Sequence, residues 1–106
     1  MKRRVKNDIL FEGGVKINDI VYSPKECSYL AVGTSRGDLY FLNVELGYKL
    51  HKAVKGLFST PIKNIDWDRE SRYVQIVSKT IEYGFADVEK GRVVDGRLNI
   101  ITNFTS

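Results

Sequence analysis

The sequence of 106 residues has very little of the chemistry that builds disulfides and metal sites. Cys27 is the only cysteine and His51 the only histidine. A single cysteine excludes a disulfide within the chain and favours a reducing compartment. A zinc site needs several Cys or His ligands, and a reactive cysteine needs an activating neighbour. We therefore interpret Cys27 as a turn or edge residue and His51 as solvated surface.

Long apolar runs are also missing. The longest are far shorter than the ~20 residues that cross a bilayer. The basic start of the chain is not followed by the apolar core of a secretory signal. The sequence therefore predicts neither a membrane span nor a signal peptide, and we expect a cytoplasmic protein.

Catalytic motifs are few. Asp66 and Asp68 flank Trp67 and could form a carboxylate pair, but Asp68 fits a turn better. Gly13-Gly14 and Gly33 are not followed by the helix that a phosphate-binding loop requires. Trp67 could stack on a base, but its position favours a core role. We expect no enzymatic activity, no cofactor and no metal.

Positive charge is concentrated at the N-terminus. The formal net charge is +4, and Lys2, Arg3, Arg4 and Lys6 are all basic, so the rest of the chain is neutral. Such a tail can contact nucleic acid, an anionic lipid surface or an acidic protein, or it can be a solvated terminus.

What the sequence does contain is an internal repeat with an offset of 44–45 residues. Residues 17–23, 29–32 and 41–44 align with residues 62–68, 73–76 and 85–88. Strands are predicted at 17–22, 29–34, 38–44 and 49–54, and again at 62–67, 73–78, 82–88 and near 91–95. A period of ~40–45 residues with four strands per unit is typical of a β-propeller blade.

The third strand of the first repeat supports this interpretation. Leu39 and Phe41 point to one face of the strand, and Tyr40 and Leu42 point to the other. Both faces are therefore apolar, as in a blade that packs between two other blades. Tyr22, Trp67, Phe41 and Phe85 occupy matching positions of the two repeats, and we expect all four to be buried.

The predicted fold class is all-β, with about two four-stranded antiparallel blades that belong to a larger propeller. Propellers close with about 4–8 blades, and repeat units need about three copies for stability. The chain should therefore self-associate or need further blades. Residues 1–16 form the basic tail, with strand character at 8–11 that could serve a neighbouring blade. Residues 17–60 form the first blade, and residues 61–106 form the second blade with a C-terminal tail.

Both repeats resemble a known family. Tyr22–Val44 resembles a WD-repeat, with a Ser-Pro turn, a second strand that ends near Gly33-Thr34, and a third strand. The second copy resembles a repeat of the echinoderm microtubule-associated protein-like family. The matching elements are Asp66-Trp67, Tyr73-Val74-Gln75, Ile81-Glu82 and Phe85-Ala86-Asp87. The resemblance covers about residues 17–95.

The chain also departs from that family. Leu42-Asn43 and Ala86-Asp87 replace its Trp-Asp pair, and Gly56-Leu57 replaces its Gly-His pair. Its Asp-His-Ser-Trp hydrogen-bond network therefore cannot form in full, although Thr34 and Ser78 lie where its hydroxyl would be.

The resemblance implies a non-catalytic protein-interaction scaffold whose partner is tubulin or microtubules. Propellers usually bind partners through loops, because loops vary on a rigid frame. The candidate residues are Arg36, Leu57 and Phe58 in the loops and Lys2, Arg3 and Arg4 in the tail. Phe58 could instead lie between the blades. The alternative function is nucleic-acid or anionic-surface binding through the basic tail.

Overall fold

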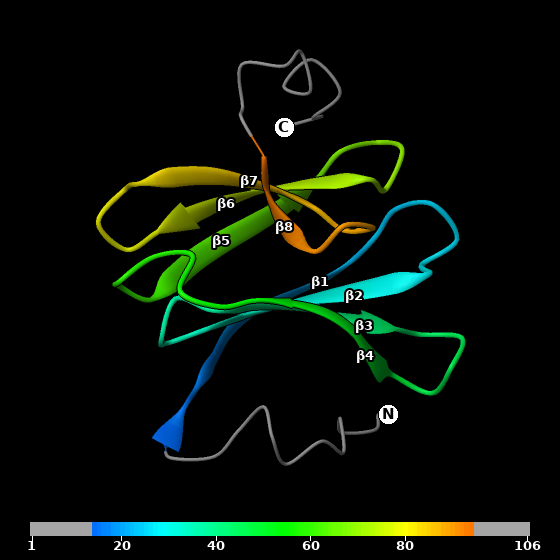
Figure 1. Cartoon of the computed structure of the whole chain (residues 1–106), viewed down its shortest axis with the longest axis horizontal. Helices are drawn as coiled ribbons and strands as arrows, with labels where there is room; N and C mark the ends of the chain where they lie inside the picture. Colours follow the sequence, from blue (N-terminus) through cyan, green and yellow to red (C-terminus); the bar gives the residue numbers. More distant parts are fainter. Residues whose placement is uncertain (1–13, 95–106) are drawn as a thin grey trace.

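The computed structural model describes residues 14–94, which form two antiparallel sheets of four strands each (Figure 1). The first sheet contains β1 (Ile17–Tyr22), β2 (Tyr29–Thr34), β3 (Leu39–Asn43) and β4 (Lys49–Val54) in that order. The second contains β5 (Ile62–Trp67), β6 (Tyr73–Ser78), β7 (Tyr83–Asp87) and β8 (Arg92–Val94). The all-β prediction is confirmed. The expected strand at 8–11, residues 1–13 of the predicted N-terminal tail and residues 95–106 lie outside the described residues.

The repeat extends to the pairing of the strands. In the first sheet Ile17 pairs with Thr34, and in the second Ile62 pairs with Ser78. Both first strands have a register irregularity directly after this pair, which is typical of a β-bulge. The two sheets are therefore two copies of the same structural unit, down to the position of the irregularity.

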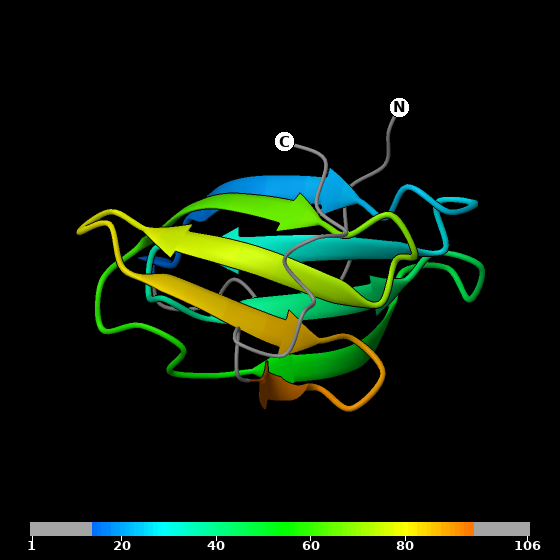
Figure 2. The same cartoon turned by 90° about the horizontal axis from the view of Figure 1, so that it is seen from above.

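The two sheets stack face to face, with β1 closest to β5 (Figures 1 and 2). Phe41 of β3 is fully buried between them and its ring lies 5.8 Å from that of Trp67. The same core contains Ala31, Leu39, Val54, Ile62, Ile65, Val74, Ile76, Ala86 and Val88. Burial of this apolar surface is the main force that holds the sheets together.

Hydrogen bonds also join the sheets along β1 and β5. The Trp67 indole N–H donates to the Val21 carbonyl at 3.0 Å, and the Ile65 amide donates to the Asp19 carboxylate at 2.9 Å. The Asn18 side-chain amide donates to the Ile62 carbonyl at 3.0 Å. These contacts fix how far one sheet can slide along the other.

Two of the four expected core aromatics are not buried. Trp67 is 6% exposed and Phe41 is buried, but Tyr22 is 46% exposed and Phe85 is only partly buried. The reason is that the two sheets stack in the same orientation, with the same face of each repeat pointing the same way. Matching positions of the two sheets therefore face in the same direction. Trp67 faces the first sheet, whereas Tyr22 lies on the opposite, outer side of the stack. Burial of all four would require a neighbouring sheet on both sides.

The outer face of the first sheet is nonetheless apolar, as the sequence predicts. Leu30, Val32, Tyr40 and Leu42 form a second buried cluster there, and Tyr48 packs against it. The rim of this face along β1 is exposed. At that rim the Tyr22 and Tyr48 hydroxyls are 2.7 Å apart, and this hydrogen bond raises the pKa of Tyr22.

Candidate partner-binding surface

The connections between strands gather at two ends of the stack (Figure 2). Because successive strands run in opposite directions, alternate connections lie at the same end. Residues 23–28, 44–48, 68–72 and 88–91 form the turn end. The other end, which we call the loop end, consists of residues 35–38, 55–61 and 79–82. It is flanked by Lys16 and Lys63.

The loop end is held together where the 55–61 connection crosses the 35–38 turn. The Phe58 amide donates to the Gly37 carbonyl at 3.2 Å, and the Gly56 amide donates to the Asp38 carboxylate at 2.7 Å. Gly37 has a φ of 80°, and a methyl group at this position would overlap the Phe58 carbonyl. Only glycine allows both the turn and this close approach of the two backbones.

The 55–61 connection also contacts the 79–82 turn. The Lys79 amide donates to the Pro61 carbonyl at 2.9 Å, and the Thr60 and Thr80 hydroxyls are 3.3 Å apart. The three connections of the loop end are therefore one continuous, hydrogen-bonded surface that spans both sheets.

The three sequence-predicted loop residues all lie at this end, but in different settings. Arg36 is exposed in the turn between β2 and β3. Leu57 and Phe58 are half-buried and pack against the core between the sheets. A methyl group on Gly84 of β7 would lie 3.3 Å from the tip of the Phe58 ring. The structure thus has Phe58 between the sheets, which was the alternative to an exposed anchor.

The loop end is basic, although residues 7–106 taken together are neutral. Asp38 and Glu82 are its acidic residues, and the basic residues are more numerous: Lys16, Arg36, Lys55, Lys63 and Lys79. At the turn end, acidic and basic side chains occur in similar numbers. The net charge of residues 7–106 does not show this difference between the two ends. Summing the charges of alternate connections between the predicted strands would have shown it from the sequence.

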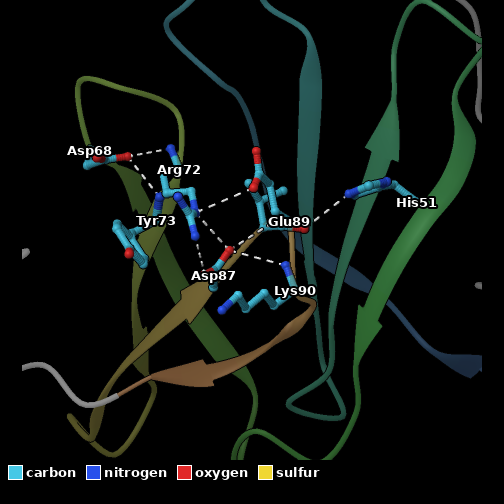
Figure 3. Close-up of polar contacts among 8 residues, drawn as sticks. His51, Asp68, Arg72, Tyr73, Asp87, Glu89 and Lys90 are labelled. Carbon is cyan, nitrogen blue, oxygen red and sulfur yellow. Dashed lines mark hydrogen bonds and ion pairs between the residues drawn. The ribbon is translucent and has the colours of Figure 1, made fainter.

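The turn end contains a polar network around Asp87, which is 2% exposed (Figure 3). Its two carboxylate oxygens accept hydrogen bonds from Arg72 at 3.1 Å each, and one also accepts from the backbone amides of Glu89 and Lys90. Burial acts to raise the pKa of Asp87, but the Arg72 hydrogen bond and these amides outweigh it, so the pKa is lowered. The same hydrogen bond raises the pKa of Arg72.

A second buried carboxylate, Asp68, belongs to the same end and is 1% exposed. It accepts from the amides of Arg72 at 2.7 Å and Tyr73 at 2.8 Å (Figure 3). The interpretation of Asp68 as a turn residue is confirmed, and Asp66 is exposed and does not share its setting. Both buried carboxylates accept hydrogen bonds from backbone amides of the turns that they close.

The only cysteine and the only histidine of the sequence lie in different settings. The His51 Nε2 lies 3.1 Å from the Val88 carbonyl, and its ring centroid is 4.9 Å from that of Tyr29. His51 is therefore half-buried across the two sheets, and its interpretation as solvated surface is wrong. Cys27 is exposed in the turn after β1, as expected. Within residues 14–94, no group of three or more His, Cys, Asp and Glu side chains could hold a metal ion.

Lys2, Arg3 and Arg4 lie outside the described residues. Nowhere in residues 14–94 is there a helix that is both long and apolar enough to cross a membrane. No protein-family model matches the sequence, and no curated protein matches it significantly.

Proposed function

We propose that the protein is a non-catalytic interaction scaffold that binds an acidic protein surface through its loop end. One observation carries the proposal: basic side chains from three connections gather on one hydrogen-bonded surface that spans both sheets. A surface with an excess of one charge attracts partners of opposite charge and speeds their association.

The frame under this surface suits binding rather than chemistry. Gly37 and the contacts of the 55–61 connection hold the loops on two sheets with a shared apolar core. Loops on a rigid scaffold are common sites of recognition. The buried carboxylates of the described residues are engaged in turns, at the opposite end of the stack.

For the partner, we propose tubulin or microtubules, with the protein acting in the cytoplasm and at the cytoskeleton. The support is the resemblance of residues 62–88 to the microtubule-associated repeat family, together with the basic loop end, because tubulin surfaces are acidic. On the same resemblance, we propose that the two sheets are WD-type blades of a larger propeller.

Co-sedimentation with polymerised microtubules tests this proposal. The protein should pellet with microtubules at low salt and be released as salt rises, because exposed charges are screened beyond about 10 Å at 0.1 M. Retention in the supernatant at low salt would contradict microtubule binding. Binding that does not change with salt would contradict a charge-driven surface.

The second candidate function is binding of nucleic acid or another anionic surface through Lys2, Arg3 and Arg4. It rests on the concentration of positive charge in the first six residues. It predicts that deleting residues 1–6 abolishes binding to a DNA duplex and its salt dependence. If the deletion leaves binding intact, the tail is not the site.

A further inference from the structure

The rim of the first sheet exposes large apolar side chains whose repeat partners are buried. Ile17, Ile20 and Tyr22 on β1 are 44%, 53% and 46% exposed. The matching residues of β5 are Ile62, Ile65 and Trp67, which are 0%, 2% and 6% exposed because the first sheet covers them. The strand register is the same in both copies. The outer side of β1 therefore carries a row of large apolar side chains, which we call the ridge, like the row that β5 packs against the first sheet.

The structure shows what this kind of ridge needs from the sheet that receives it. A methyl group on Gly33 of β2 would lie 2.6 Å from Cγ2 of Ile62 and 3.1 Å from Cδ1 of Ile65. Optimal contacts between carbon atoms are about 3.5–4.0 Å, so a Cβ at this position would push the ridge away. The receiving face therefore needs a glycine here, and Asp19 adds an acceptor for the amide of Ile65.

The outer face of the second sheet, which a second copy of this chain would present, does not match the receiving face. Val77 occupies the position in the second sheet that Gly33 occupies in the first, because it pairs with the matching residues of the neighbouring strands. Strand alternation directs its side chain to the outer face. Asn64, Asp66 and Gln75 likewise replace Asp19, Val21 and Ala31.

We propose that the β1 rim receives a further blade of the same repeat type, one that carries a glycine opposite Ile17 and Ile20, and that Val77 prevents a second copy from taking this place. This inference rests on the proposal that the sheets are propeller blades. The sequence predicts that the chain either self-associates or needs further blades, and the inference favours further blades. The contact is confined to the rim, because Leu30, Val32, Tyr40 and Leu42 are already buried.

An altered copy of the chain can serve as the probe for this rim. Asn64→Asp, Asp66→Val, Gln75→Ala and Val77→Gly give the β5 and β6 positions of its outer face the residues that β1 and β2 carry on the receiving face. Ile20→Lys in the same probe blocks its own rim, so it can receive wild-type protein but cannot self-associate. The matched control carries Val77→Ala with the same other substitutions, and the two probes differ by one methyl group.

Analytical ultracentrifugation of wild-type protein mixed with each probe gives the readout. The glycine probe should form a one-to-one complex and bind at least about tenfold more tightly than the alanine probe, while wild-type protein alone stays monomeric. Absence of a complex with the folded glycine probe, equal binding by both probes, or wild-type self-association through Ile20 would each overturn the proposal.

If the glycine probe does not fold, Gly33→Ala tests the same steric rule inside the chain. It should lower the denaturation midpoint clearly, and an unchanged midpoint would overturn the inference. None of these measurements involves the loop end or microtubules. A failure here therefore leaves the proposed partner-binding surface untouched, and a failure to bind microtubules leaves this inference untouched.

Discussion

Trp67 and Tyr22 occupy the same position of the two repeats, and their replacement by alanine should have very different effects. Trp67 lies between the sheets, 6% exposed, and Tyr22 lies on the outer rim, 46% exposed. If the sheets stack in the same sense, only the first substitution removes packing from the core.

The structure sets the size of each effect. Replacing a buried Trp by Ala typically costs about 3–5 kcal/mol. Trp67 also loses its ring contact with Phe41 and leaves the Val21 carbonyl without its indole donor, which places the cost near the upper end of that range. Tyr22→Ala removes a half-exposed ring and an exposed hydrogen bond to Tyr48, so about 1 kcal/mol is expected.

Urea denaturation followed by far-UV circular dichroism measures both losses. A domain with about 5–15 kcal/mol of stability should show a large fall in midpoint for Trp67→Ala and a small one for Tyr22→Ala. Trp67→Phe is the intermediate control, since it keeps a six-membered aromatic ring but loses the N–H donor and part of the indole volume. Equal losses for Trp67→Ala and Tyr22→Ala would refute the same-sense stack.

Two further predictions concern the two ends of the stack. Arg72→Ala should destabilise the protein by about 1–3 kcal/mol, because it leaves Asp87 buried without its main donor, although Arg72 itself is 38% exposed. The pKa of Asp87 is lowered on folding. The stabilisation from this ion pair is therefore present above the ordinary Asp pKa and is lost as the pH falls through the pKa of Asp87 in the folded protein. The denaturation midpoints of the wild-type protein and Arg72→Ala should therefore converge in acid. Gly37→Ala should speed hydrogen exchange of the loop-end amides, whereas Gly47→Ala, which has a similar φ of 75° and open space around it, should leave them unchanged.

The eight strands were largely predictable, because their apolar positions repeat with the same spacing in both copies. The predicted limits at 38–44 and 82–88 differ from β3 and β7 by one residue at each end. Turn residues such as Pro24 and Asp68 marked the connections in the first and second copies. Local pattern and turn chemistry thus determine the sheets.

The wrong predictions of burial have one physical origin. A sequence repeat does not determine which face of each sheet packs against a neighbouring sheet. Tyr22 and Phe85 match buried positions but lie on outer faces of the stack. The position of Phe58 and the inter-sheet role of His51 also depend on how the sheets stack. Likewise, the basic loop end exists only once alternate connections are brought together in space.

Charge reversal at each end of the stack gives the most direct test of the proposed function. Lys63→Glu with Lys79→Glu changes the loop end, and Lys49→Glu with Lys90→Glu makes the same change in net charge toward the turn end; all four lysines are exposed. Microtubule co-sedimentation at low salt should be lost or strongly weakened for the first variant and nearly retained for the second. Equal weakening of both variants, or loss only in the turn-end variant, would contradict binding through the loop end.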